Sequence, residues 1–262
     1  MDTGSCINAL RRFFGIRGPA KQLRSDCGTN FIGASRELGF VKDPEKHLSI
    51  LRYLSGQGCT WDFNPPHVSH MGGAWERMIG MTRRILDSMF LQNRQSHLTH
   101  EVLCTFLTEV SAILNARPLV PISSDPEMPF LLSPAMLLTQ KTGVSAPPGN
   151  FTRNDLFKSQ WRQVQAMANE FWTRWRREYL PTLQNRRKWA HPSRNLQIGD
   201  IVLLKENQLS RNEWPMGLIT SVFPSSDGTI RKIEVKTASQ GISKNFIRPI
   251  TEVILIVPKK DG

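Results

Sequence analysis

Two acidic residues, Asp26 and Glu76, stand in local sequences that suit metal-dependent phosphoryl transfer. Asp26 follows a short extended run and precedes a turn at Gly28, so its carboxylate is predicted to lie where a strand ends. Glu76 follows a Pro- and Gly-rich loop, residues 64–75, and is predicted to lie in the first turn of a helix. Carboxylates so placed can hold divalent cations that activate an oxygen nucleophile.

A simpler interpretation stays open for each of these acids. Asp26 could serve only as a turn residue. Glu76 could be an acid that the helix dipole favours in a first turn, with no further function. The sequence around each residue does not separate the two interpretations.

Taken together, the segments around both acids resemble the second and third acidic motifs of retroviral and retrotransposon integrases. The sequence is closest to Pao/BEL-type elements. The resemblance extends over nearly the whole chain. The matching segments are SDCGTNF at 25–31, FNPPH at 63–67, GGAWER at 72–77, ILNARPL at 113–119, and much of 161–183.

The resemblance implies a ribonuclease H-like catalytic core in which three carboxylates hold two Mg²⁺ or Mn²⁺ ions during DNA integration. Asp26 and Glu76 would be two of these catalytic metal ligands. The family's third ligand is an Asp on the first strand, and this chain begins downstream of where that strand should be. Asp2 lies in the approach to the first helix and does not replace it. We therefore expect a polynucleotidyl transferase fragment that is inactive alone.

A second hypothesis stays open beside this one. The chain could be a non-catalytic DNA- or chromatin-binding remnant of a retrotransposon. In the complete family, the resemblance also implies a homo-oligomer that acts in the nucleus.

The expected fold class is α/β, with a truncated integrase core followed by a helical segment and a small all-β barrel. The barrel resembles a chromodomain or a Src-homology-3 domain. The predicted boundaries are 1–140 for the core, 141–155 for a linker, 156–192 for the helical segment and 193–257 for the barrel.

Helical spacing predicts helices in the first half near residues 7–14, 75–90 and 100–114. Leu48, Leu51 and Leu54 predict one more helix in the insert between Asp26 and Glu76. Thr99 is predicted to cap the third helix. Prolines between 121 and 134 predict an absence of regular structure there. The apolar residues predicted to be buried are Ile79, Ile85 or Leu86, and Met89 in the second helix, and Leu103, Phe106, Leu107, Val110, Ile113 and Leu114 in the third.

In the second half of the chain, the sequence pattern predicts a long helix followed by short strands. The helix carries aromatic and apolar residues on one face, interpreted as packing rather than base stacking. Strands are predicted at 201–204, 217–223 and 230–237, with a hairpin turn at Asp227-Gly228. The predicted helical face comprises Phe157, Trp161, Val164, Ala168, Phe171 and Trp175.

The net charge is +12, from 34 Lys and Arg against 22 Asp and Glu, which indicates a polyanionic partner such as DNA. The alternative for each basic cluster is a solvated helix face. The residues predicted to contact DNA are Arg77, Arg83, Arg84, Arg174, Arg176, Arg177, Arg186, Arg187 and Lys188.

The four cysteines have no paired spacing, so neither a disulfide framework nor a cysteine-based zinc site is predicted. His67 with His70, and His97 with His100, are three apart but lack an accompanying cysteine pair. Apolar runs are too short to cross a bilayer, and no signal peptide is recognised. We therefore expect an intracellular protein without a membrane partner.

Overall fold

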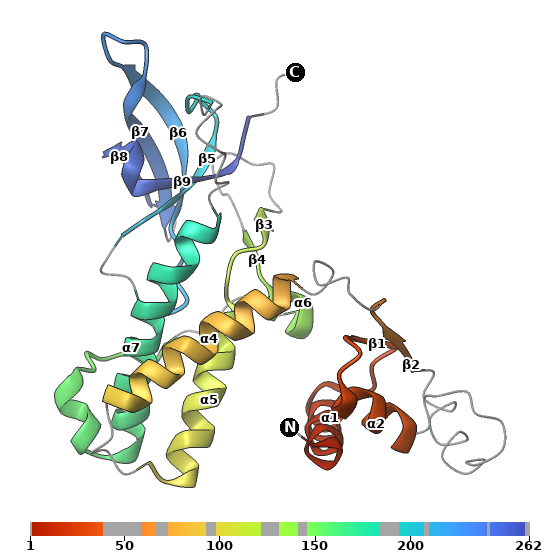
Figure 1. The fold of residues 1–262 in the computed structure, drawn as a ribbon. Coiled ribbons are helices and arrows are strands. Elements are labelled where there is room, and N and C mark those ends of the chain that lie inside the picture. The colour runs from red at the N-terminus through yellow and green to blue at the C-terminus, as the bar shows by residue number, and fades with distance from the viewer. Residues whose placement is uncertain are drawn as a thin grey trace. The chain divides into compact units, whose positions relative to one another are not determined.

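The computed structural model describes residues 2–38, 59–65, 73–92, 98–121, 131–140, 146–183, 194–206, 210–239 and 242–259. The chain divides into two compact units, Met1–Gly80 and Met81–Gly262. Figure 1 shows their elements. The division falls inside helix α4 (Gly73–Gln92).

The described residues of the first unit before α4 form two helices and a pair of parallel strands. The elements are α1 (Thr3–Arg17), β1 (Gln22–Ser25), α2 (Thr29–Glu37) and β2 (Thr60–Phe63). Asp2 caps α1, since its Oδ1 accepts a hydrogen bond from the Ser5 amide at 2.6 Å. Strands β1 and β2 pair with Arg24 opposite Asp62. The predicted strand before Asp26 is confirmed.

The second unit holds most of the helices. They are α4, which begins in the first unit, α5 (His100–Asn115), α6 (Pro134–Thr139), η2 (Arg153–Phe157), α7 (Gln160–Tyr179) and η3 (Leu180–Leu183). Thr99 caps α5 as predicted, because its Oγ1 accepts a hydrogen bond from the Val102 amide at 3.3 Å.

Two burial predictions for α4 and α5 are wrong. Ile79 is 50% exposed, whereas Met81 is buried together with Ile85 and Met89. On α5, Leu107 is 42% exposed. Both helices form as predicted. On each helix, however, the buried face is narrower than the apolar stripe in the sequence.

The prolines between 121 and 134 do not exclude regular structure at the ends of that span. Strands β3 (Val120–Pro121) and β4 (Leu131–Leu132) form a short antiparallel pair. Pro134 then occupies the start of α6, where its missing N–H costs no hydrogen bond.

Helix α7 buries most of one side against the rest of its unit. Gln160 donates to Thr99 and Gln165 to Glu109, so α5 and α7 pack together across the predicted linker. Phe157 and Trp161 are 73% and 54% exposed, which corrects their predicted burial. Phe157 belongs to η2 and so falls outside the periodicity of α7. Val164, Ala168, Phe171 and Trp175 are buried as predicted.

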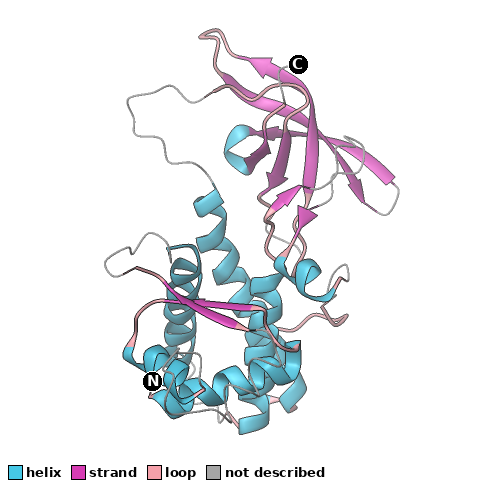
Figure 2. Cartoon of the chain, turned by 90° about the vertical axis from the view of Figure 1, so that its right-hand side faces the viewer, coloured by secondary structure: helices cyan, strands magenta, loops and turns pink. Residues whose placement is uncertain are grey.

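The C-terminal strands form a five-stranded antiparallel sheet in the order β8-β7-β6-β5-β9. Figure 2 draws the strands in magenta. The strands are β5 (Ile201–Leu204), β6 (Met216–Pro224), β7 (Ile230–Ser239), β8 (Ile242–Pro249) and β9 (Val253–Val257), with η4 (Ile250–Glu252) before β9. The hairpin at Asp227-Gly228 is confirmed, and Gly228 has a φ of 75°. Ile233 and Val235 are fully buried, as their alternation with charged residues predicts.

Helix α7 and the sheet are joined by a buried polar and aromatic contact. Arg176 is 8% exposed and donates to the backbone carbonyl oxygens of Leu204 and Glu206. The Trp214 ring packs edge-on against Trp172 and Tyr179. Since these contacts orient α7 on the sheet, the predicted helical segment and barrel are packed against each other. Among the described residues, no helix is long and apolar enough to span a membrane.

Candidate functional site

Asp26 lies directly after β1. Its side chain is exposed, and a tight turn fixes its orientation. Its Oδ1 accepts a hydrogen bond from the Gly28 amide at 2.9 Å. The turn is tied to the end of β2, because the Asn64 amide donates to the Ser25 carbonyl at 2.8 Å and Cys27 Sγ donates to the Asn64 carbonyl at 3.2 Å. Asp26 therefore lies at the carboxyl end of β1, as predicted, and the structure adds that β1 pairs with the parallel strand β2.

Glu76 lies in the first turn of α4, and its side chain is exposed. Three residues of the predicted motifs, Pro66, His67 and Gly72, lie outside the described part of the chain, as do His70 and the helix predicted in the insert.

The donor chemistry of these two acids fits a hard divalent cation, since both present exposed carboxylate oxygens. Their arrangement does not complete a metal centre. Within the described ranges, no three His, Cys, Asp or Glu side chains gather into a group that could hold a metal ion.

Helix α4 also presents the first three predicted DNA-binding residues. Arg77, Arg83 and Arg84 are all exposed. Arg77 and Arg84 are seven residues apart and share a face of the helix, whereas Arg83 lies about 100° around from Arg84. Arg84 pairs with Glu178 at 3.6 Å, but its side chain is 70% exposed, so this pair stays accessible to solvent.

The three predicted DNA-binding residues of α7 have different environments. Arg174 is partly buried and donates to Ser88 at 2.9 Å, to Gln92 and to Glu170. Burial lowers the pKa of Arg176, and the nearby Glu206 carboxylate opposes this effect. Arg177 is exposed. In this conformation, Arg177 alone of the three presents its side chain to an external phosphate.

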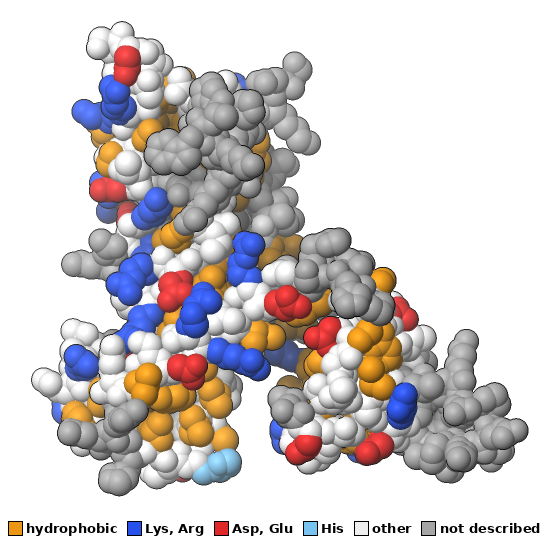
Figure 3. Space-filling model, in the orientation of Figure 1, with side chains coloured by type: hydrophobic (Ala, Val, Ile, Leu, Met, Phe, Trp, Pro, Cys, Tyr) orange, Lys and Arg blue, Asp and Glu red, His pale blue; other side chains and the backbone are white. Residues whose placement is uncertain are grey.

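The remaining predicted cations, Arg186, Arg187 and Lys188, lie outside the described residues. Figure 3 shows basic side chains, with a few acidic ones among them, over α4 and α7 on the face in view. This distribution is compatible with contact to a polyanion through several weak ion pairs.

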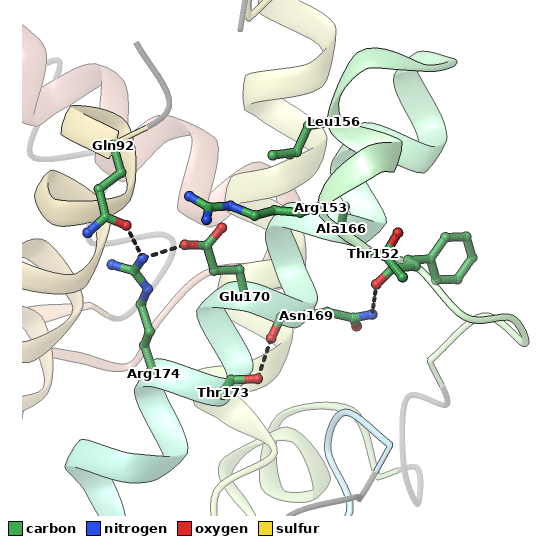
Figure 4. Close-up of a pocket in the computed structure, with 10 residues that line it drawn as sticks. Gln92, Thr152, Arg153, Leu156, Ala166, Asn169, Glu170, Thr173 and Arg174 are labelled. Atoms are coloured by element: carbon green, nitrogen blue, oxygen red, sulfur yellow. Dashed lines mark hydrogen bonds and ion pairs between the residues drawn. The ribbon is translucent and has the colours of Figure 1, made fainter. Parts of the chain in front are cut away.

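A pocket of about 400 Å³ lies between the end of α4, η2 and α7. Figure 4 shows the Arg174 guanidinium between Gln92 and Glu170, with Arg153 extending from η2 into the same space. Because Glu170 neutralises Arg174, the cavity lining has only a small positive charge, and we assign it no anionic ligand.

The structure also brings together a pair that the sequence interpretation missed. His100 and Cys104, four residues apart, are adjacent on one face of α5. Their i, i+4 spacing on a predicted helix is the signal in the sequence that indicates this proximity.

Comparisons with known proteins give limited information. The model of a family described as "Family of unknown function (DUF5641)" matches residues 159–256, which run from the N-cap of α7 into β9. No curated protein matches the sequence. A solved structure, the cryoEM structure of the simian T-cell lymphotropic virus intasome in complex with PP2A regulatory subunit B56 gamma, has 11% identity and a TM-score of 0.35. The similarity covers 99% of this chain and 66% of that chain, and is too weak to establish a fold or a function.

Proposed function

We propose that this chain is an integrase-related protein of the Pao/BEL retrotransposon kind, which binds DNA electrostatically during DNA integration. The supporting motifs are the two acidic segments around Asp26 and Glu76. In this proposal both carboxylates are ligands of Mg²⁺ or Mn²⁺ in a ribonuclease H-like active site that needs a third carboxylate. The chain alone is expected to be inactive in strand transfer.

One observation carries the DNA-binding part of this proposal. The helix that holds Glu76 in its first turn also presents Arg77, Arg83 and Arg84 to solvent. A ligand of a catalytic metal must lie near the phosphodiester that reacts, and flanking phosphates then lie within reach of neighbouring cations. The net charge of the whole chain, +12, also favours binding to DNA.

The test is a salt titration of binding to duplex DNA of unrelated sequences, measured by fluorescence anisotropy. We expect affinity to depend little on sequence. Replacing Arg77, Arg83 and Arg84 by Ala should flatten the slope of log K against log salt by about 0.9 for each phosphate contact that is lost. Arg231→Ala is the control, because Arg231 is an exposed cation of the sheet hairpin paired with Asp227. An unchanged slope in the triple variant would show that these three residues of α4 do not contact DNA.

A non-catalytic DNA- or chromatin-binding remnant is the second candidate. It is supported by the net charge of +12, which favours binding to a polyanion without requiring a catalytic site. The two candidates predict the same salt dependence and differ in catalysis. Adding a polypeptide that carries the family's first acidic strand should restore strand transfer only if Asp26 and Glu76 are functional ligands. Nuclear action and a homo-oligomer belong to the integrase proposal.

A further inference from the structure

Two aromatic side chains lie at the surface where η2 meets α7. Phe157 is 73% exposed and Trp161 is 54% exposed. Every other aromatic residue of α7 is buried, namely Phe171, Trp172, Trp175 and Tyr179. Aromatic rings carry a large apolar area, and these two leave more than half of theirs in water. Most of their surface is therefore available for contact with a ligand.

Trp161 is held in position by its neighbours. The ring of Phe151, which is buried, packs edge-on against it, with the ring centroids 5.4 Å apart. The Arg162 guanidinium lies 5.4 Å from the centroids of both rings, and its Nε donates to Asp155 Oδ1 at 2.9 Å. Because these contacts order the indole before a ligand arrives, binding to it costs little side-chain entropy.

A cation directly follows each of the two exposed rings. Lys158 comes after Phe157, and Arg162 comes after Trp161. Both cations pair with Asp155, whose side chain is only 3% exposed, whereas those of Lys158 and Arg162 are 57% and 35% exposed. The carboxylate is therefore buried while the cations meet solvent, and the surface beside the rings is positive. Such a surface attracts a polyanion.

Single-stranded nucleic acid combines the two properties that this surface fits. Its unpaired bases offer π faces that stack on aromatic side chains, and its phosphates pair with Lys and Arg. In a duplex the bases are stacked on one another, so protein rings reach their faces only at ends, loops or bulges. A protein partner could also cover the rings, but it would need their apolar area and not their aromatic character.

We propose that Phe157 and Trp161 stack on unpaired bases of single-stranded DNA or RNA, with Lys158 and Arg162 beside the phosphates. Binding at this site is largely independent of base sequence, because every base has a π face. The inference goes beyond the proposed function, which concerns duplex DNA and the arginines of α4. The interpretation of the aromatic face as packing then holds for the buried rings of α7 and not for these two.

The test measures binding of the full chain to fluorescein-labelled oligo-dT of about twelve nucleotides by fluorescence anisotropy, with oligo-rU of the same length as the RNA probe. We expect Phe157→Ala and Trp161→Leu each to weaken binding about tenfold or more, since stacking on one base is lost. Trp161→Phe keeps an aromatic face and should bind within about threefold of the wild type. Phe223→Ala is the matched control, because Phe223 is an exposed aromatic residue of β6 and its loss should leave binding unchanged.

Three results would overturn the proposal: a wild type that binds neither probe, unchanged binding of both probes in Phe157→Ala or Trp161→Leu, or Trp161→Leu binding as tightly as Trp161→Phe. The last result would show that apolar area is sufficient, as in a protein contact. Thermal unfolding shows whether each variant folds. If Trp161→Leu fails to fold, Phe157→Ala decides the question, because it removes a side chain that is 73% exposed.

A duplex probe separates this site from the proposed function. Trp161→Leu should leave duplex affinity and its salt dependence unchanged, because paired bases offer no free face. Weaker oligonucleotide binding in Trp161→Leu supports the stacking site even if the chain does not bind duplex DNA. Conversely, duplex binding that depends on α4, with no effect of Phe157→Ala or Trp161→Leu on either single strand, supports the proposed function and overturns the stacking site.

Discussion

Arg176 donates a hydrogen bond from Nη2 to the backbone carbonyl oxygen of Leu204 at 3.3 Å, and so connects α7 to β5. Its guanidinium also donates to the Glu206 carbonyl. Arg176→Ala would leave both acceptors without this donor inside the protein. We expect the free energy of unfolding to fall by about 3 kcal/mol, measured by urea denaturation.

The adjacent residue provides the control for this substitution. Arg177 is exposed, so Arg177→Ala should change stability by less than about 0.5 kcal/mol but should flatten the salt dependence of DNA binding. Equal destabilisation by the two variants would contradict the contact between Arg176 and the sheet.

Gly217 of β6 is expected to tolerate no side chain. A Cβ there would meet Val235 Cγ1 and would lie 2.9 Å from the Lys236 carbonyl oxygen. Gly217→Ala should therefore destabilise the protein by about 1–3 kcal/mol, since the obstruction includes backbone. Gly80→Ala, in open space on α4, should instead stabilise by up to about 1 kcal/mol. Thermal unfolding of both variants tests this contrast.

Asp155 should stabilise the protein in a pH-dependent way. The Thr152 amide, then Arg162 and Lys158, hold the pKa of this carboxyl well below its usual range. A depressed native pKa gives stability that is fully present above the unfolded pKa of about 3.9 and is lost as the pH falls towards the native value. Below about pH 4, the free energy of unfolding should therefore fall less in Asp155→Asn than in the wild type.

Denaturation at pH 3 and pH 7 measures this effect. Asn154→Ala is the control, because Asn154 is an exposed, uncharged residue of the same short helix. The prediction fails if the wild type and Asp155→Asn lose the same stability between these two pH values.

Arg186, Arg187 and Lys188 form the remaining predicted DNA contact. If all three reach phosphates, their joint replacement by Ala should flatten the slope of log K against log salt by about 2.7, at about 0.9 for each contact. The measurement is the same salt titration on unrelated duplexes. An unchanged slope would show that these three side chains do not contact DNA and instead face solvent or a protein partner.

Strand transfer should be undetectable for the purified chain with Mg²⁺ or Mn²⁺, because two carboxylates do not hold two ions in the geometry of in-line transfer. The assay follows joining of a labelled duplex end to a plasmid. Transfer that is abolished by Glu76→Gln, but retained in the matched α4 variant Asp87→Asn, would show that this chain supplies a complete site.

The sequence determined those elements whose signals are local. Thr99 begins α5 because its side chain satisfies a backbone amide within one turn. Asp227-Gly228 turns the chain because glycine adopts a positive φ without strain. The alternation around Ile233 and Val235 identified the buried face of β7, since successive side chains of a strand point to opposite sides.

Tertiary structure decided which residues of each pattern are available for function. Arg176 and Arg177 are adjacent basic residues that the sequence alone does not distinguish. In the structure, Arg176 is buried against β5 and Arg177 is exposed. Ile79 belonged to the apolar stripe of α4 and is half exposed. Periodicity defines the faces of a helix, but the burial of a face depends on neighbours that the chain brings from distant positions. For the same reason, the difference in exposure between Arg176 and Arg177 followed only from the packing of α7 against the sheet.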